Sequence, residues 1–151
     1  MKIAIFPGSF DPITVGHESI IKRALPLFDK IILAIGVNSS KNYMFSLEER
    51  MESLRNCFSN EPKIDVDSYN GLTIDFCKKR NANYILRGLR VAADFEFERN
   101  IALMNQAMDP NIETLFLISE TKYSAISSTI IRDIIRNNGD VSEFVPQSFK
   151  L

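Results

Sequence analysis

Apolar residues follow two alternating patterns along the chain. Short runs rich in β-branched residues predict strands, and longer stretches with apolar residues at helical spacing predict helices. The run Lys-Ile-Ile-Leu-Ala-Ile-Gly-Val is almost continuously apolar, which is typical of a strand buried on both faces of a parallel sheet. The predicted strands are Lys2–Phe6, Lys30–Val37, Lys63–Tyr69, Tyr84–Arg87 and Glu113–Ile118. The predicted helices cover residues 16–28, 46–58, 73–80, 92–108 and 127–137.

The regular alternation of strands and helices predicts an α/β protein. Right-handed crossovers between successive parallel strands give a Rossmann-like doubly wound fold, with a five-stranded parallel sheet and helices on both faces. The 151 residues fit one domain, because no linker, repeat or low-complexity segment divides them.

Polar clusters follow each predicted strand, at the edge where such folds bind ligands. After the first strand, Pro7, Gly8, Pro12 and Gly16 mark a loop that ends in the chain's only histidine, His17. A loop followed by a helix start favours anion binding, and a histidine there can be cationic near neutral pH. The alternative is a histidine that merely caps its own helix. A metal site or a catalytic triad finds little support in the surrounding residues.

Three further clusters contain groups that suit phosphate. Arg87 and Arg90 flank a glycine after the fourth strand, although the acidic residues at 94, 96 and 98 could simply pair with them. Lys41 follows the second strand and would be an ordinary loop lysine without that position. The hydroxyls of Ser127, Ser128 and Thr129 open the last helix, where capping and phosphate binding are compatible.

Composition and missing motifs narrow the range of functions. A net charge of −1 argues against a dedicated nucleic-acid binder, and no apolar run is long enough for a membrane span. Cys57 and Cys77 lack zinc-ligand spacing and fit free thiols, so with no signal-peptide pattern we expect a cytoplasmic protein. Neither a P-loop nor a Gly-x-Gly-x-x-Gly fingerprint is present, which disfavours P-loop phosphoryl transfer and dinucleotide redox chemistry.

The sequence nevertheless resembles a known family. Thr14-Val15-Gly16-His17 resembles the T/H-x-G-H signature of the nucleotidyltransferase superfamily related to class I aminoacyl-tRNA synthetases. Ile126-Ser127-Ser128-Thr129, with Arg132 three positions on, resembles the second signature. The segments 7–12, 44–50, 87–96 and 139–141 are similar in order and spacing to the bacterial phosphopantetheine adenylyltransferases, over nearly the whole chain.

That resemblance implies transfer of AMP from ATP to 4′-phosphopantetheine, giving dephospho-CoA and pyrophosphate, with Mg²⁺ accompanying ATP. It also implies a homohexamer and assigns His17 the catalytic role. The implied acceptor-binding residues are Ser9, Lys41, Thr73 and Arg87. The implied ATP-binding residues are Ser9, Phe10, His17, Gly88, Leu89, Arg90, Glu98, Tyr123, Ser124, Ala125, Ile126, Ser127, Ser128 and Thr129. Thr73 departs from the family's larger apolar residue, and Thr129 stands where a third serine is common.

Two other functions compete with this one. Another small nucleotidyltransferase could act on nicotinamide mononucleotide or glycerol phosphate, since the first signature is shared widely. A non-catalytic nucleotide-binding domain would keep the ATP-binding residues without the reaction. Arg87, Arg90 and Lys41 favour phosphopantetheine over the first alternative, and the complete set of matched positions disfavours the second.

Overall fold

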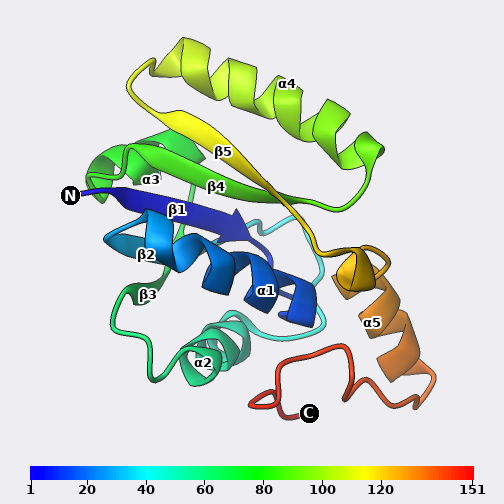
Figure 1. The fold of residues 1–151 in the computed structure, drawn as a ribbon. Helices are drawn as coiled ribbons and strands as arrows, with labels where there is room; N and C mark the ends of the chain where they lie inside the picture. Colours follow the sequence, from blue (N-terminus) through cyan, green and yellow to red (C-terminus); the bar gives the residue numbers. More distant parts are fainter.

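Five parallel strands form one twisted sheet in the computed structural model, which describes residues 1–151 (Figure 1). In their order across the sheet the strands are β3 (Ile64–Tyr69), β2 (Lys30–Gly36), β1 (Ile3–Gly8), β4 (Tyr84–Leu89) and β5 (Glu113–Ile118). The chain builds outwards from β1 in one direction and then from β4 in the other. The predicted doubly wound parallel sheet is therefore confirmed, with its reversal of strand order between β1 and β4.

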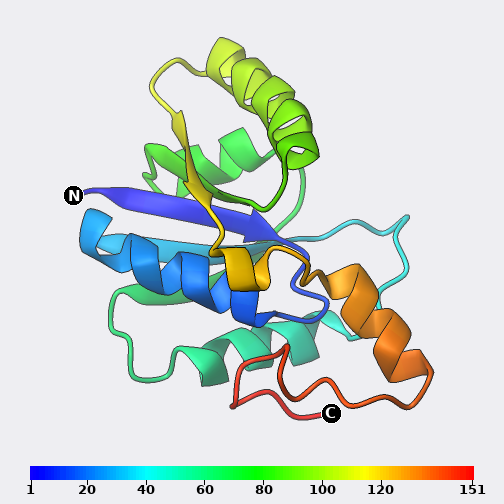
Figure 2. The same cartoon turned by 45° about the vertical axis from the view of Figure 1, so that its right-hand side comes forward.

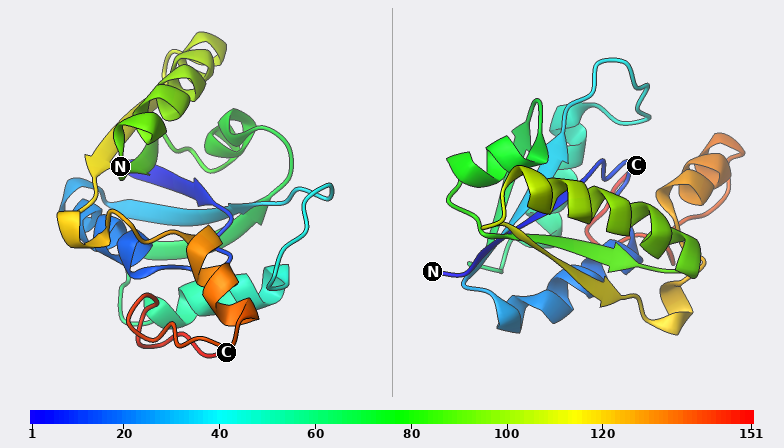
Figure 3. Two further views of the ribbon diagram at one scale, coloured as in Figure 1. Left: turned by 90° about the vertical axis from the view of Figure 1, so that its right-hand side faces the viewer. Right: turned by 90° about the horizontal axis from the view of Figure 1, so that it is seen from above.

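Helices cover both faces of this sheet. The α-helices are α1 (Val15–Ala24), α2 (Leu47–Cys57), α3 (Thr73–Lys79), α4 (Ala92–Met108) and α5 (Ser128–Arg136), with short 3₁₀ helices η1 (Leu25–Leu27) and η2 (Thr121–Tyr123). Figures 1 and 3 show α1 and α2 on one face and α3 and α4 on the other. In Figure 2, α5 lies beyond the carboxyl ends of the strands. None of the helices combines the length and apolar character needed to cross a membrane.

The inner strand β2 is buried on both faces, as its apolar run predicts. Ile31, Leu33 and Ile35 pack into the cluster beneath α1 and α2, whereas Ile32 and Ala34 join the cluster beneath α3. All five side chains are at most 1% exposed. Fully burying such an aliphatic side chain contributes about 1.5–3 kcal/mol, so β2 alone anchors both halves of the core.

Local signals explain where the helices begin and end. The Ser46 hydroxyl accepts a hydrogen bond from the backbone N–H of Glu49, whose carboxylate accepts one from Ser46, so the predicted capping box at the start of α2 is confirmed. Helix α4 has the predicted bounds and stops before the extended residue Asp109, which precedes Pro110. Pro26 lies in η1, directly after α1, where its missing N–H costs little.

Strands β1 and β4 each continue two residues beyond the predicted ends. Their mutual pairing covers only Ala4 with Tyr84 and Ile5 with Ile85. Beyond those pairs, β1 stays hydrogen-bonded to β2 and β4 to β5, so the two halves of the sheet part at the carboxyl edge. Pro7 occupies this unpaired side of β1, where its lack of an N–H removes no ladder bond to β4. This separation leaves room for a binding site at the point where the strand order reverses, between β1 and β4.

Candidate active site

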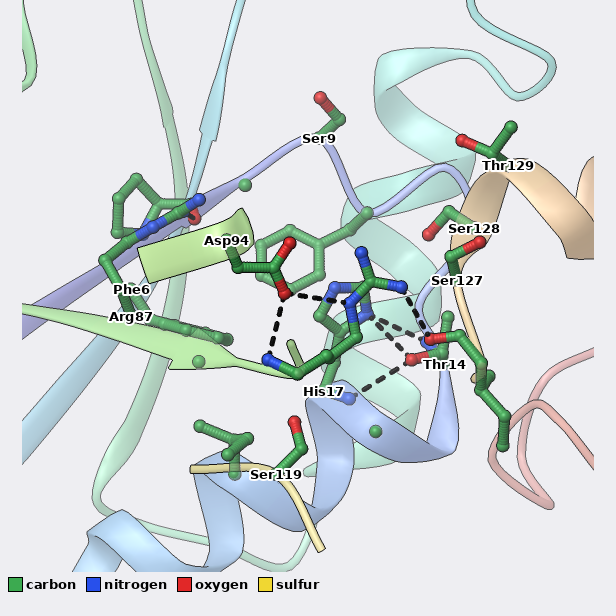
Figure 4. Close-up of a pocket in the computed structure, with 18 of the residues that line it drawn as sticks. Phe6, Ser9, Thr14, His17, Arg87, Asp94, Ser119, Ser127, Ser128 and Thr129 are labelled. Atoms are coloured by element: carbon green, nitrogen blue, oxygen red, sulfur yellow. Dashed lines mark hydrogen bonds and ion pairs between the residues drawn. The ribbon is translucent and has the colours of Figure 1, made fainter. Parts of the chain in front are cut away.

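A cavity of about 490 Å³ opens where β1 and β4 part. Its lining comes from the β1–α1 loop, the start of α1, the β2–α2 loop, the end of β4, α4 and the start of α5. In the view of Figure 4, His17 lies between Arg87 on one side and the hydroxyls of Ser127, Ser128 and Thr129 on the other. The polar clusters after the first, second, fourth and fifth strands therefore meet, as their positions predict.

Most of the predicted site residues line this cavity. They are Ser9, Phe10, His17, Lys41, Arg87, Gly88, Arg90, Glu98, Ile126, Ser127, Ser128 and Thr129. Thr73 lines a second cavity of about 330 Å³, which shares Ser9, Arg87 and Glu98 with the first. Leu89, Tyr123, Ser124 and Ala125 line neither, and their contact with ATP stays a prediction.

His17 both caps α1 and faces the cavity. Its Nδ1 accepts a hydrogen bond of 3.0 Å from the backbone N–H of Thr14, while the Thr14 hydroxyl accepts one of 3.2 Å from the backbone N–H of His17. The role of His17 as a helix cap is thus compatible with a role in ligand binding. Because Nδ1 is an acceptor here, the neutral imidazole carries its proton on Nε2, which is left to donate to a ligand.

The environment of His17 favours a neutral imidazole at pH 7. Burial lowers the pKa of His17 to about 4, and the positive charges of Arg87 and then Arg90 act in the same direction. The expectation of a histidine that is cationic near neutral pH is therefore wrong for the unliganded site. Its ring is held edge-on by Phe10, with the ring centroids 5.0 Å apart.

Arg87 is held rigidly by a buried carboxylate. Its Nε and Nη2 donate to the two carboxylate oxygens of Glu98 over 2.9 and 2.6 Å, and its Nη1 donates to the backbone carbonyl of Pro7. Glu98 is 9% exposed. The bidentate pair fixes the guanidinium plane in the gap between β4 and β1, and two of its five N–H groups stay free for an anion. The resemblance assigns Glu98 to ATP binding, whereas in the structure its carboxylate is paired with Arg87.

Arg90 forms a second, more exposed pair. The Asp94 carboxylate accepts from the backbone N–H of Arg90 over 2.9 Å and lies 3.5 Å from its Nε. The Nη1 group of Arg90 also donates to the carbonyl of Ile126 over 3.4 Å, which ties β4 to the start of α5. The alternative that both arginines pair with nearby acidic residues therefore holds for Glu98 and Asp94, and the pairing orients the two guanidinium groups.

The start of α5 presents hydroxyls and backbone N–H groups. Ser127 caps the helix by accepting from the backbone N–H of Ile130 over 3.3 Å, and the Ser128 hydroxyl donates to the carbonyl of Pro12 over 2.8 Å. Capping is therefore confirmed. An anion at this helix start would meet unpaired backbone N–H groups and the positive end of the helix dipole.

Three residues that the sequence reasoning did not assign also shape the site. Arg132 lines the cavity, and its Nη1 donates to the carbonyl of Asp11 over 2.8 Å. Asp11 and Arg50 are 3% and 4% exposed and bind the backbone of the loops around them. Arg132 belongs to the quoted second signature, which could have found it. For buried polar residues such as Asp11 and Arg50, the sequence holds no signal of their partners.

No cluster of three or more His, Cys, Asp or Glu side chains could hold a metal ion. The two carboxylates that line the main cavity, Asp94 and Glu98, are both paired with arginines.

Comparison with known proteins places the chain among nucleotidyltransferases. The cytidylyltransferase-like family profile matches residues 5–134. A phosphopantetheine adenylyltransferase of Flavobacterium psychrophilum is 57% identical over 151 residues, covering 100% of this chain and 99% of that protein. One of Flavobacterium johnsoniae is 55% identical with the same coverage.

A solved structure shares the fold. A bifunctional NMN adenylyltransferase/ADP ribose pyrophosphatase of Francisella tularensis, complexed with AMP and a manganese ion, superposes with a TM-score of 0.70 at 17% identity. The match covers 95% of this chain and 44% of that chain, less than half of the bifunctional protein.

The pKa of His17 predicts how stability depends on pH. An unfolded chain takes up this proton near its ordinary pKa of 6.5, whereas the folded protein resists it down to about 4. The free energy of unfolding should therefore fall as pH drops from 6.5 towards 4, by at most about 3 kcal/mol from this group. Urea unfolding of the wild type and of His17→Gln across that range measures the difference, and NMR of the single histidine follows its titration. Protonation of the folded imidazole above pH 6 would contradict the assignment.

Proposed function

The chain belongs to the phosphopantetheine adenylyltransferases within the cytidylyltransferase-like family, and we propose that it transfers AMP from ATP to 4′-phosphopantetheine. The products would be dephospho-CoA and pyrophosphate, in the penultimate step of coenzyme A synthesis. The observation that carries the proposal is the position of His17 between two sets of anion-binding groups. Arg87 lies on one side of His17 and the hydroxyls at the start of α5 lie on the other, and Lys41 and Arg90 line the same cavity.

In this proposal, ATP and the acceptor bind to different groups of residues. ATP would bind along the ends of β4 and η2 and the start of α5, through the predicted residues from Gly88 to Arg90 and from Tyr123 to Thr129. The acceptor would extend into the second cavity past Thr73, whose hydroxyl lies 2.8 Å from that of Tyr69. Its phosphate would meet Lys41 and Arg87. Ser9 lines both cavities, which places it between the two substrates in this proposal.

The reaction then depends more on the alignment of the two substrates than on a general base. An oxygen of the acceptor phosphate, largely ionised at neutral pH, attacks the α-phosphorus of ATP. The new phosphorus–oxygen bond forms as the bond from the α-phosphorus to the bridging oxygen breaks, and pyrophosphate leaves with that electron pair. The Nε2–H of His17 donates to the phosphate oxygens where negative charge grows. Arg90 and the α5 start stabilise the departing pyrophosphate.

Mg²⁺ would arrive as part of the ATP substrate. Both cavity carboxylates are committed to arginines, so the cation's ligands would be phosphate oxygens and water, which are the ligands that Mg²⁺ prefers. A cytoplasmic location is a further part of the proposal, and the free thiols of Cys57 and Cys77 fit a reducing compartment.

We propose a homohexamer on the strength of the family resemblance, and several exposed apolar side chains on α4 offer surface that such an assembly would bury. The exposed large side chains of α4 are Phe95, Phe97, Ile101, Leu103, Met104 and Met108. The neighbouring edge strand β5 ends in Ile118, which is 72% exposed. Exposed apolar side chains of this size favour burial against other copies of the chain.

An acceptor panel tests the function. With ATP and Mg²⁺, we expect 4′-phosphopantetheine to yield dephospho-CoA and one pyrophosphate per turnover, detected by mass spectrometry and a coupled pyrophosphate assay. Nicotinamide mononucleotide and glycerol 3-phosphate, offered under the same conditions, should react at least 100-fold more slowly. Faster reaction with either would assign the chain to another acceptor, and no pyrophosphate with any acceptor would favour a non-catalytic nucleotide-binding role.

Two substitutions separate the two roles of His17. In His17→Gln the side-chain amide nitrogen takes the place of Nε2, so the donor survives while the cap to Thr14 is lost. In His17→Asn an oxygen takes the place of Nδ1, so the cap survives without the donor. We expect Gln to keep a single-turnover rate at least tenfold above that of Asn, and Asn to be the more stable in urea. Equal rates for the two variants would argue against the Nε2 donor.

Light scattering after size-exclusion chromatography tests the assembly. The wild type should elute with the mass of six chains, and Phe97→Asp, which places a charge on the apolar face of α4, should give smaller species. Leu27→Asp is a matched control at an exposed leucine of η1 and should leave the hexamer intact. A monomeric wild type would refute the hexamer.

A further inference from the structure

The loop that carries Lys41 has few attachments to the rest of the protein. After β2, the backbone N–H of Val37 bonds to the carbonyl of Tyr69. From Asn38 to Tyr43 the hydrogen bonds of the loop are local, such as those of Ser40 to the Asn38 side chain. The Lys41 side chain lines the main cavity and lies 5.9 Å from the Tyr43 ring. Its position therefore depends on where the loop is next held.

Asp11 holds the far end of that loop. Its Oδ2 accepts from the backbone N–H of Met44 and its Oδ1 from that of Phe45, both over 2.9 Å. The carboxylate is 3% exposed and comes from the β1–α1 loop, 33 and 34 residues earlier in the sequence. Hydrogen bonds from backbone N–H groups to an ionised, buried carboxylate are among the stronger ones, so this anchor is a stiff one.

Arg50 reinforces the same junction from α2. Its Nε donates to the carbonyls of Phe45 and Ser46, over 3.1 and 3.3 Å, and its Nη1 donates to the carbonyl of Ser9 over 2.9 Å. Its guanidinium stacks on the Tyr43 ring at 3.9 Å. One side chain thus joins the loop bearing Ser9 to the loop bearing Lys41.

We propose that Asp11 and Arg50 are positioning residues, which set the place of the Lys41 ammonium over the acceptor subsite without touching either substrate. This inference rests on the proposed function, because it takes 4′-phosphopantetheine as the acceptor. Asp11 also has Arg132 on its other side, with Nη1 on its backbone carbonyl at 2.8 Å and 4.0 Å from its Oδ2. The β1–α1 loop therefore holds the loop that carries Lys41 in place relative to α5.

A double-mutant cycle tests the proposal by calorimetry with free 4′-phosphopantetheine. In Asp11→Asn the amide NH₂ opposes one of the two backbone N–H donors, so half of the anchor is lost. We expect the dissociation constant for 4′-phosphopantetheine to rise about tenfold, and that for ATP less than threefold. In a Lys41→Ala background the same substitution should change acceptor affinity less than twofold, because no ammonium is left to misplace.

Hydrogen exchange provides a second readout that does not depend on activity. The amides of Met44 and Phe45 should be protected in the wild type and exchange at least tenfold faster in Asp11→Asn. Asp29→Asn is a matched control, because Asp29 also accepts from a backbone N–H, that of Lys2, at the opposite edge of the sheet. It should leave exchange in the loop and acceptor affinity unchanged.

Arg50→Lys keeps the charge but loses the forked contacts, and it provides the same cycle if Asp11→Asn does not fold. Equal loss of acceptor affinity with and without Lys41, or an equal loss of ATP affinity, would overturn the positioning role. A wild-type protein that binds ATP but not 4′-phosphopantetheine would instead refute the proposed acceptor, so the two failures are distinguishable.

Discussion

The parting of β1 from β4 after their second paired residue is the constraint on which the site depends. Each strand keeps its outer neighbour, so the sheet loses only the ladder between its two halves. That leaves polar backbone groups unpaired in the gap, and the Arg87 side chain occupies part of it by donating to the Pro7 carbonyl. An unpaired backbone carbonyl needs a hydrogen-bond donor, and Arg87 provides one to Pro7 while its remaining N–H groups stay free at the cavity.

The need to satisfy backbone hydrogen bonds also determines the tautomer of His17. Helix α1 needs its first N–H groups satisfied, and the Thr14–His17 box does this with the imidazole as acceptor. The cap dictates the tautomer, and the tautomer leaves the Nε2–H for a ligand. Phe10, at a positive φ of 47°, packs its ring against the imidazole and fixes its plane. A requirement of the helix end thus determines which hydrogen-bonding group the cavity receives.

The sequence predicts this architecture better than it predicts the ends of its strands. Helix α4 has its predicted bounds, because Asp109-Pro110 is a local stop signal. Strand β4 reaches Leu89 because Gly88 and Leu89 pair with Leu117 and Ile118 of β5, a contact made by tertiary structure. The low pKa of His17 also comes from tertiary structure, because burial, Arg87 of β4 and Arg90 just after that strand cause it. The sequence shows which residue types follow the strands, but not the electrostatic potential that these residues produce together in the folded cavity.

The concentration of positive charge in the cavity explains why its arginines are paired with carboxylates. Unpaired, Arg87 and Arg90 would repel each other and move freely, whereas Glu98 and Asp94 neutralise and orient them. Burial is the main reason that the pKa of His17 is low, and the positive charges of Arg87 and then Arg90 add to that effect. Phosphate oxygens bound in this cavity, as we propose, would accept from the two free N–H groups of Arg87 and from the Nε2–H of His17, while the ion pairs keep both arginines oriented.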